Sequence, residues 1–301
     1  MQKTHIEWVK NPDESQGITC NSKTGCLNGC SYCFARELAN GRLKQRYLAN
    51  GLVACDYEGG KNGSDKELEA ALANPFYPRF WPERLEQSRR RKKPTGIFLD
   101  DMSDWMGDYW PEEWTRQELQ VMRDCPQHRF YTLTKQPQNL RKFSPFPDNC
   151  WVGVTATDSY DFINRIGYLG MTQAKTKYVS FEPLLAWDDF LNELFERYIG
   201  LLNWLIIGAC TGTLSDLKVL LGNTRYLDLD LMPYGSKWTL QPKIKWVQEI
   251  VEAADKAGVK VFLKYNLVET IPIDRPFYRQ NDNGWAIRQE MPNERKELRL
   301  S

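Results

Sequence analysis

The sequence predicts an α/β fold with a parallel sheet, and two observations support this prediction. Short apolar runs that end in polar residues recur at residues 95–100, 129–134, 151–155, 178–181, 204–208 and 259–263, as buried parallel strands do. Segments with helical spacing of apolar residues lie between them, at 111–123, 159–168, 187–198 and 242–257. Alternating strands and helices favour a parallel sheet or barrel.

A further, weaker strand signal at residues 17–19 precedes a cysteine-rich segment. Including it gives six or seven strands, fewer than the eight of a complete barrel. The sequence has no internal repeat and no low-complexity tract long enough to be a linker. We therefore expect a single domain over residues 1–301, with N-terminal and C-terminal extensions around the barrel.

Charge and composition exclude several classes of protein. The 40 basic residues nearly balance the 39 acidic ones, so no global field draws the chain toward a polyanion. No apolar stretch is long enough to span a bilayer, and residues 1–8 lack the apolar core of a signal peptide. We expect a cytoplasmic protein without membrane contact. His5 and His128 are the only histidines, which excludes catalysis by three or more of them.

Polar and reactive side chains follow the predicted strands. In parallel α/β folds the carboxyl ends of the strands form the active-site face. The set comprises Asp100, Asp101, Lys135, Thr155, Thr157, Glu182, Cys210 and Lys264. The alternative for each is a helix cap or a solvated group, but together they predict one polar mouth.

The most specific motif is Cys26-x3-Cys30-x2-Cys33, with the aromatic Tyr32 before the last cysteine. Three thiolates on a tight loop can each bind one iron of a [4Fe-4S] cluster and leave the fourth iron open. That iron can chelate the amino and carboxylate groups of S-adenosylmethionine. Gly25 and Gly29 suit a loop wrapped closely round a cluster.

A structural zinc site is the alternative interpretation of the same motif. Such a site usually has four ligands, often from two C-x2-C halves, and no second half is present. Cys20 or Cys55 could supply the fourth thiolate.

This spacing resembles the radical-SAM superfamily. Further blocks, at residues 6–8, 11–12, 24–26, 97–104, 133–135, 151–155, 180–185 and 261–264, resemble the phage Gp37/Gp68 family over about residues 6–265. The resemblance implies a partial (β/α)6 TIM-type barrel of parallel strands, with the cluster loop after the first strand. It also implies a [4Fe-4S] cluster that cleaves S-adenosylmethionine to a 5′-deoxyadenosyl radical, with an electron donor such as flavodoxin or ferredoxin.

The resemblance also suggests roles for the residues at the mouth. Asp100, Asp101, Ser103 and Asp104 are expected to hold the amino group of the cofactor. Glu182 is expected to bind its ribose or methionine part, with an ion pair to Lys135 as the alternative. The remaining expected cofactor contacts are Tyr32, Thr155 and Thr157.

Lys135 and Cys210 are the expected catalytic residues. Where the family tends to have Gly-Gly-Glu, this chain reads Gly-Ala-Cys-Thr-Gly at residues 208–212. We expect Cys210 to donate a hydrogen atom to a product radical, and a buried packing role is the alternative.

The substrate is left open, with a nucleic acid or nucleotide as a candidate. The basic run at residues 89–93 and the aromatic residues before it combine features of a nucleic-acid surface, although a solvated helix face is the commoner origin of such a run. The rival function is a non-enzymatic, metal-stabilised nucleic-acid-binding module in which Cys20, Cys26, Cys30 and Cys33 hold zinc.

Overall fold

The computed structural model describes residues 2–56, 64–222, 226, 228–267, 271–281 and 284–292. Its centre is an eight-stranded sheet in the order β1-β2-β5-β6-β7-β8-β9-β13. The strands are β1 (Gln2–Lys3), β2 (Ile18–Cys20), β5 (Gly96–Leu99), β6 (Arg129–Thr134), β7 (Cys150–Thr155), β8 (Thr176–Phe181), β9 (Trp204–Ile207) and β13 (Lys260–Leu263). All seven after β1 pair in parallel, which confirms the predicted α/β class and each predicted strand.

Most of the predicted helices are present. The helices that follow or precede strands on the outer face are α4 (Pro82–Arg90), α5 (Glu112–Asp124), α6 (Ser159–Gly170), α7 (Asn192–Ile199) and α9 (Ile244–Ala257). The predicted helix at 187–198 begins later than expected, because Asp188 accepts the Phe190 amide at 3.0 Å and starts a 3-10 turn, Asp189–Leu191, before α7. No helix among the described residues has the length and apolar character needed to cross a membrane.

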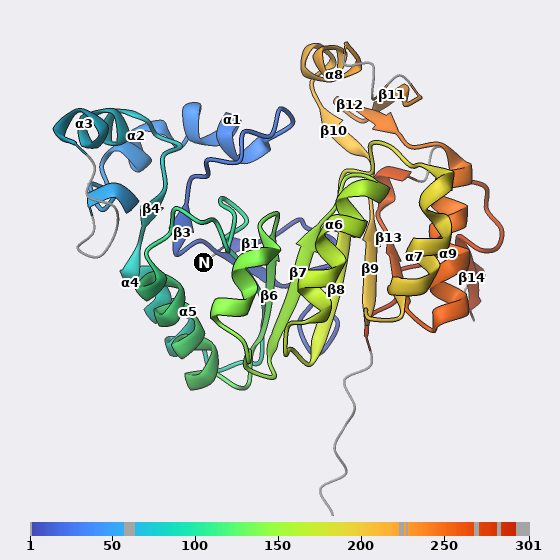
Figure 1. The fold of residues 1–301 in the computed structure, drawn as a ribbon, viewed down its shortest axis with the longest axis horizontal. Helices are drawn as coiled ribbons and strands as arrows, with labels where there is room; N and C mark the ends of the chain where they lie inside the picture. The colour runs from blue at the N-terminus through green and yellow to red at the C-terminus, as the bar shows by residue number, and fades with distance from the viewer. Residues whose placement is uncertain are drawn as a thin grey trace, which may run out of the picture.

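Two small units flank the carboxyl end of the sheet (Figure 1). On one side lie α1 (Phe34–Asn40), α2 (Lys44–Leu48) and α3 (Asp65–Ala73), with the short pair β3 (Lys23–Thr24) and β4 (Arg79–Phe80) beneath them. On the other side lie α8 (Leu214–Leu221) and a three-stranded sheet of β10 (Cys210–Gly212), β12 (Lys237–Gln241) and β11 (Asp230–Tyr234). α1 and α2 are separate helices because Gly41 leaves the helical conformation.

Side chains that alternate along the strands build two separate cores. In β5, Ile97 and Leu99 join the helix-side core, whereas Phe98 joins an interior core on the opposite face. Trp8, only 1 % exposed, fills this interior from the N-terminal segment. Its ring centroid lies 4.8 Å from that of Phe98 and 6.1 Å from that of Trp204. The open side of the partial barrel is therefore packed with aromatic rings.

Both edges of the parallel sheet are covered by antiparallel chain. β1 pairs with β2 at one edge, and the segment after β14 (Tyr278–Asn281) and β15 (Gly284–Ile287) pairs with β13 at the other. There the Leu263 amide donates to the Arg288 carbonyl at 2.7 Å, and the Glu290 amide donates to the Val261 carbonyl at 3.0 Å. Covered edges do not offer a free ladder to a second chain.

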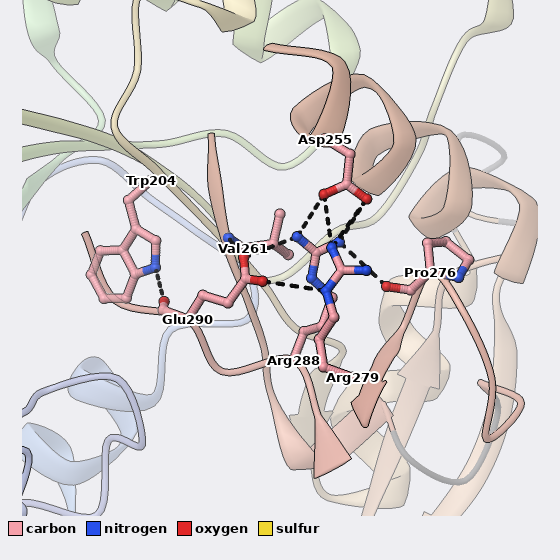
Figure 2. Close-up of polar contacts among 7 residues, drawn as sticks. All are labelled: Trp204, Asp255, Val261, Pro276, Arg279, Arg288 and Glu290. Carbon is pink, nitrogen blue, oxygen red and sulfur yellow. Dashed lines mark hydrogen bonds and ion pairs between the residues drawn. The ribbon is translucent and has the colours of Figure 1, made fainter. Parts of the chain in front are cut away.

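A buried charge network fixes this C-terminal cover (Figure 2). Arg288, whose side chain is 1 % exposed, lies 2.8 Å from Asp255 of α9 and 2.9 Å from Glu290. Arg279 lies 3.0 Å from the same aspartate but is 42 % exposed. Glu290 also receives the Val261 amide at 3.0 Å, and its carbonyl accepts the Trp204 indole at 2.8 Å.

Replacing Arg288 with methionine is expected to lower the free energy of unfolding by about 3 kcal/mol, because Glu290 and Asp255 lose their buried cation. This value is at the lower end of the range for breaking a buried ion pair, because the Asp255 side chain is 38 % exposed and stays in contact with water. The partly exposed Arg279, changed to methionine, should cost less than about 1 kcal/mol. Urea unfolding of the two variants measures this difference; equal losses would contradict the role given to Arg288.

Candidate active site at the mouth of the sheet

A cavity of about 370 Å³ lies at the carboxyl ends of the strands, between the two flanking units. Its volume is in the range of small-molecule and cofactor sites. Among the residues predicted from sequence, the lining brings together Cys26, Cys30, Tyr32, Cys33, Asp100, Asp101, Ser103, Asp104, Lys135, Thr155, Glu182 and Cys210. Thr157 is not part of this lining: its hydroxyl donates to Asp161 at 2.9 Å at the start of α6.

The cysteine loop follows β2 and β3 and depends on two glycines. Gly25 has φ +86°, and a side chain there would lie 2.4 Å from the Tyr77 carbonyl oxygen. Gly29 has φ +74°, which is also a left-handed conformation. The loop is tied down by the Gly25 amide, which donates to Met102 at 3.0 Å, and by the Cys26 amide, which donates to Phe76 at 3.2 Å.

Asn28 clamps the middle of this loop to the sheet. Its side-chain amide donates to Asp104 at 2.7 Å and accepts from Gln136 at 2.6 Å. Asp104 in turn accepts the Lys135 amide at 2.7 Å and the Thr134 hydroxyl at 2.5 Å. The carboxylate of Asp104 is thus occupied within the chain, and we assign it to positioning the loop.

The eight cysteines are free thiols, so no disulfide competes for the three in the loop. Burial raises the pKa of the Cys26 thiol to about 11, and the Cys33 sulfur accepts the Arg36 amide at the start of α1. Among the described residues, no three ligating side chains gather tightly enough to hold one metal ion. A cubane does not require such a cluster, because each of its thiolates binds a different iron. Three thiols along one wall of a cavity are therefore a suitable ligand set for a [4Fe-4S] cluster.

Cys20 lies apart from the loop cysteines. It is 2 % exposed, belongs to the helix-side core, and its sulfur lies 3.6 Å from the Arg84 carbonyl oxygen of α4. It is not among the residues that line the cavity. Cys55, the other candidate for a fourth thiolate, is also outside this lining, so the structure brings neither candidate into the cavity with the loop cysteines.

Asp100 ends β5 in a strained conformation, with φ +61° and 3 % exposure. Its Oδ1 accepts the Lys23 amide at 2.8 Å, while its buried Oδ2 has no partner among the described residues. Burial, followed by the nearby charge of Glu118, raises the pKa of Asp100 well above its ordinary value. Glu118 is itself paired with the buried Lys23 at 2.8 Å.

Asp101 and Ser103 offer further unused polar atoms in the same wall. The Oδ1 of Asp101 and the hydroxyl of Ser103 are buried without a hydrogen-bond partner in the described chain. Burial raises the pKa of Asp101 to about 6, so this carboxyl is mostly ionised above neutral pH. Unsatisfied buried polar groups are costly, and a ligand that pairs with them would remove that cost.

Glu182, at the end of β8, is the centre of a second polar group. It forms an ion pair with Lys264 and accepts the Trp8 indole N–H at 3.1 Å. The alternative pairing with Lys135 is therefore wrong. Burial alone would lower the pKa of Lys264, but the adjacent Glu182 charge raises it. Gly208 leaves room for the pair, because a side chain there would lie 2.8 Å from the Lys264 side chain.

Lys135 instead lies near the aromatic ring of the cysteine motif. Its ammonium is 5.8 Å from the Tyr32 ring centroid, a cation–π distance, and it has no ion pair among the described residues. Burial raises the pKa of Tyr32, so the phenol stays protonated. Thr155 also lines the cavity, and its backbone carbonyl accepts a hydrogen bond from the Arg165 guanidinium.

Cys210 stands on the opposite wall, in β10. It is 4 % exposed and lines the cavity while also packing on the helix-side core. Asn266 fixes the backbone beside it: the Ala209 amide donates to Asn266 at 3.2 Å, and Asn266 donates to the Ala209 carbonyl at 2.8 Å. Burial raises the pKa of the Cys210 thiol to about 12, which keeps its S–H bond at neutral pH.

Comparison with known proteins places this site in a family. The model described as "Protein of unknown function (DUF5131)" matches residues 3–216. The chain belongs to this family. The matched residues include the cysteine loop, the three acids after β5, Glu182 and Cys210. β11 and β12 follow the match. No curated protein matches the sequence.

Solved structures of spore photoproduct lyase share the fold of this DUF5131 protein. A cysteine-to-serine mutant has a TM-score of 0.52 at 11% identity, over 88% of this chain and 79% of that chain. A cysteine-to-alanine mutant with dinucleoside spore photoproduct has a TM-score of 0.52 at 10% identity, over 85% and 78%. At such identities the likeness establishes the fold, a partial barrel of parallel strands.

The basic run of this DUF5131 protein lies at the other end of the sheet. Residues 89–93 lead directly into the amino end of β5, opposite the cavity. Arg89 pairs with Asp124 at 2.9 Å, and Lys93 pairs with Asp13 at 3.1 Å. These ion pairs and this position indicate that the basic run is a solvated helix face and not a substrate contact.

Sequence reasoning missed several lining residues, namely Ile6, Trp8, Asn28, Ser180, Lys237 and Asn266. Trp8 precedes the first parallel strand and Lys237 lies on an unpredicted hairpin, so neither stands at the end of a parallel strand. The Asn28 side chain could have been singled out, since it stands between two cysteines of the motif. Ser180 lies within β8 and not at its end, so the sequence alone did not indicate that it lines the cavity.

Proposed function

We propose that the protein is a radical-SAM enzyme that binds a [4Fe-4S] cluster through Cys26, Cys30 and Cys33. The observation that carries the proposal is that these three thiols share one cavity with unsatisfied acids at the mouth of a partial barrel. The fold is also that of spore photoproduct lyase, a radical-SAM enzyme. The specific resemblance to the phage Gp37/Gp68 family stays a prediction.

When bound, the cluster supplies one electron to the sulfonium of S-adenosylmethionine, giving methionine and a 5′-deoxyadenosyl radical. Transfer of a hydrogen atom from the substrate to this radical would give 5′-deoxyadenosine. Asn28 and Asp104 hold the cysteine loop in place during this step. Tyr32, Thr155 and Glu182 line the space for the nucleoside part of the cofactor.

Of the three acids after β5, Asp101 suits the N–H groups of the cofactor's amino group best. Asp104 is occupied by the chain, and burial raises the pKa of Asp100 well above its ordinary value, which disfavours the charged form that accepts hydrogen bonds best. Asp101 ionises near neutral pH and has a free, buried oxygen. Ser103 can accept a second hydrogen bond from the same amino group.

Asp101→Asn is expected to weaken binding of S-adenosylmethionine about tenfold or more at pH 7.5, the cost of losing a charged hydrogen bond. Because the pKa is near 6, the native affinity should fall as the pH drops from 7.5 to 5.5, and this decline should flatten in the variant. Equilibrium binding to the cluster-containing protein measures both. Asp108→Asn, an exposed acid outside the cavity, is the control. Equal affinities for Asp101→Asn and native protein would contradict the assignment.

A nucleoside-containing substrate is the class that we propose for this site. Support comes from the structural neighbour with dinucleoside spore photoproduct and from the cationic Lys135 and Lys237 in the lining. We propose that the electron comes from a separate protein, such as flavodoxin or ferredoxin.

The decisive experiment is an anaerobic reconstitution with iron and sulfide, followed by dithionite and S-adenosylmethionine. Formation of 5′-deoxyadenosine, detected by mass spectrometry, is the expected result, together with a brown protein. A colourless protein that retains stoichiometric zinc and forms no 5′-deoxyadenosine would instead support the metal-stabilised binding module.

A further inference from the structure

A tyrosine close to the cysteine loop has no role in the function proposed above. Tyr109 lies in the loop that connects β5 to α5. Its side chain is half-buried, and its hydroxyl oxygen is buried without a hydrogen-bond partner among the described residues. Such a hydroxyl has lost its hydrogen bonds to water and gained none in return, which costs stability unless a further group pairs with it.

The loop that carries this tyrosine runs beside the cysteine loop. Gly25 and Ser103 form a parallel bridge between the two loops. Gln136 also joins them, because its side chain donates to Asn28 at 2.6 Å and accepts the Asp108 amide at 3.0 Å. Residues on both sides of the first cysteine are therefore held against the loop between β5 and α5.

The Tyr109 hydroxyl and the Cys26 thiol are neighbours, because each acts on the pKa of the other. Burial raises the pKa of Tyr109, and the charge of Cys26 raises it further. Burial also raises the pKa of Cys26 to about 11, and the Tyr109 hydroxyl opposes that rise. Cys26 lines the cavity and Tyr109 does not, so the phenol reaches the sulfur from within the protein.

The Tyr109 ring is held in one place. A side chain at Gly107 would lie 2.3 Å from this ring, so the glycine allows the ring to fold back over the turn. The Trp110 ring centroid lies 5.0 Å away, and the Trp110 indole donates to the Asp104 carbonyl at 2.7 Å. The direction of the hydroxyl is therefore set by packing around the ring.

We propose that Tyr109 is a positioning residue of the iron–sulfur site, whose hydroxyl donates a hydrogen bond to the Cys26 sulfur when that sulfur binds iron as a thiolate. The proposal rests on the proposed function, because ligation to iron creates the charged acceptor. A neutral thiol is only a weak acceptor, which explains why the hydroxyl has no partner beside protonated Cys26. A hydrogen bond to a ligand sulfur stabilises negative charge and therefore favours the reduced state of a cluster, which holds one more electron.

The test is a redox titration of the full-length, cluster-loaded protein, without S-adenosylmethionine, followed by electron paramagnetic resonance. The variant is Tyr109→Phe, which removes only the hydroxyl. The matched control is Tyr198→Phe on α7, since Tyr198 is also partly buried against the helix-side core and lies outside the cavity lining. In Tyr109→Phe the equilibrium constant for one-electron reduction should fall about tenfold, as expected for one hydrogen bond to a charged group. That change is a shift of about 59 mV to more negative potential, at unchanged iron content.

A second readout separates the hydrogen bond from a packing role. Electron–nuclear double resonance of the reduced protein, in H₂O and in D₂O, detects exchangeable protons close to the ligand sulfurs. Tyr109→Phe should lose one exchangeable coupling that native protein and the control keep. The coupling of the Asn28 amide, which donates to Cys26 at 3.4 Å, should remain in all three proteins.

The outcomes distinguish this inference from the function on which it rests. A cluster with the same potential in native protein and Tyr109→Phe would refute the role of Tyr109 and leave the proposed function intact. A lower potential with every exchangeable coupling retained would also refute it, because the shift would then have another origin. If none of the three proteins acquires a cluster, the proposed function fails and the hydroxyl has no thiolate to pair with.

Discussion

Replacing Cys30 with alanine is expected to remove the [4Fe-4S] cluster and abolish cleavage of S-adenosylmethionine. The loss follows from ligand number: with two thiolates left, one more iron of the cubane has no protein ligand. Cys26→Ala and Cys33→Ala should behave in the same way, because all three thiols line the same cavity. Iron and sulfide content after anaerobic reconstitution measures the first effect, and 5′-deoxyadenosine formation measures the second.

Cys20→Ala and Cys150→Ala are the matched controls. Both thiols are buried in the helix-side core, at 2 % and 0 % exposure, and neither lines the cavity. Each should cost stability through a small packing defect and leave the iron content unchanged. A full cluster in the Cys30 variant, or loss of the cluster in the Cys20 variant, would show that the ligand set is wrong.

The parallel strands could be predicted from the sequence because both their faces are buried. β6 and β7 read as nearly continuous apolar runs, and their polar neighbours mark the carboxyl ends. The cysteine motif was equally plain, since its spacing is a local property of the chain. A motif formed by residues close together in the chain can be predicted without knowledge of the tertiary fold.

Other parts of the site could not be predicted because they join distant segments. The contact of Trp8 with Glu182 spans 174 positions, and the pairing of Glu182 with Lys264 spans 82. Lys135 was an equally reasonable partner in the sequence, because β6 and β13 each lie two strands from β8. On the β13 side, Gly208 after the intervening β9 leaves room for the Lys264 side chain. The sheet of β10, β11 and β12 was missed because its strands are short and partly exposed, without a clear apolar run.

The three acids after β5 illustrate a further limit. In the sequence Asp100, Asp101 and Asp104 are equivalent candidates for one role. Burial and hydrogen bonding separate them: Asp104 is occupied, burial raises the pKa of Asp100 well above its ordinary value, and Asp101 has an ionisable free oxygen. Such differences depend on the surroundings of each carboxyl, which residue type and spacing do not contain.

Replacing Cys210 with alanine is expected to separate cleavage of the cofactor from formation of product. The thiol lines the cavity across from the cysteine loop, and its raised pKa keeps the S–H bond intact at neutral pH. An S–H bond is weaker than a C–H bond, so the thiol can give a hydrogen atom to a carbon-centred product radical and become a thiyl radical. In the variant, 5′-deoxyadenosine should still form, while product per 5′-deoxyadenosine should fall at least tenfold.

The measurement uses a dinucleoside in D₂O as a probe for the proposed nucleoside-containing substrate. If the probe reacts, the exchanged thiol would place deuterium in the product of the native enzyme. Loss of that deuterium in Cys210→Ala, with normal iron content, is the expected result. A packing role predicts something else, because Cys210 also contacts the helix-side core: the variant would be less stable, and its product ratio and deuterium content would match those of native protein. Cys125→Ala, another buried core thiol outside the cavity, shows what a packing loss alone does. If Cys210→Ala and Cys125→Ala differ only in stability, Cys210 is a packing residue; if the deuterium is lost in Cys210→Ala alone, the hydrogen atom comes from its sulfur.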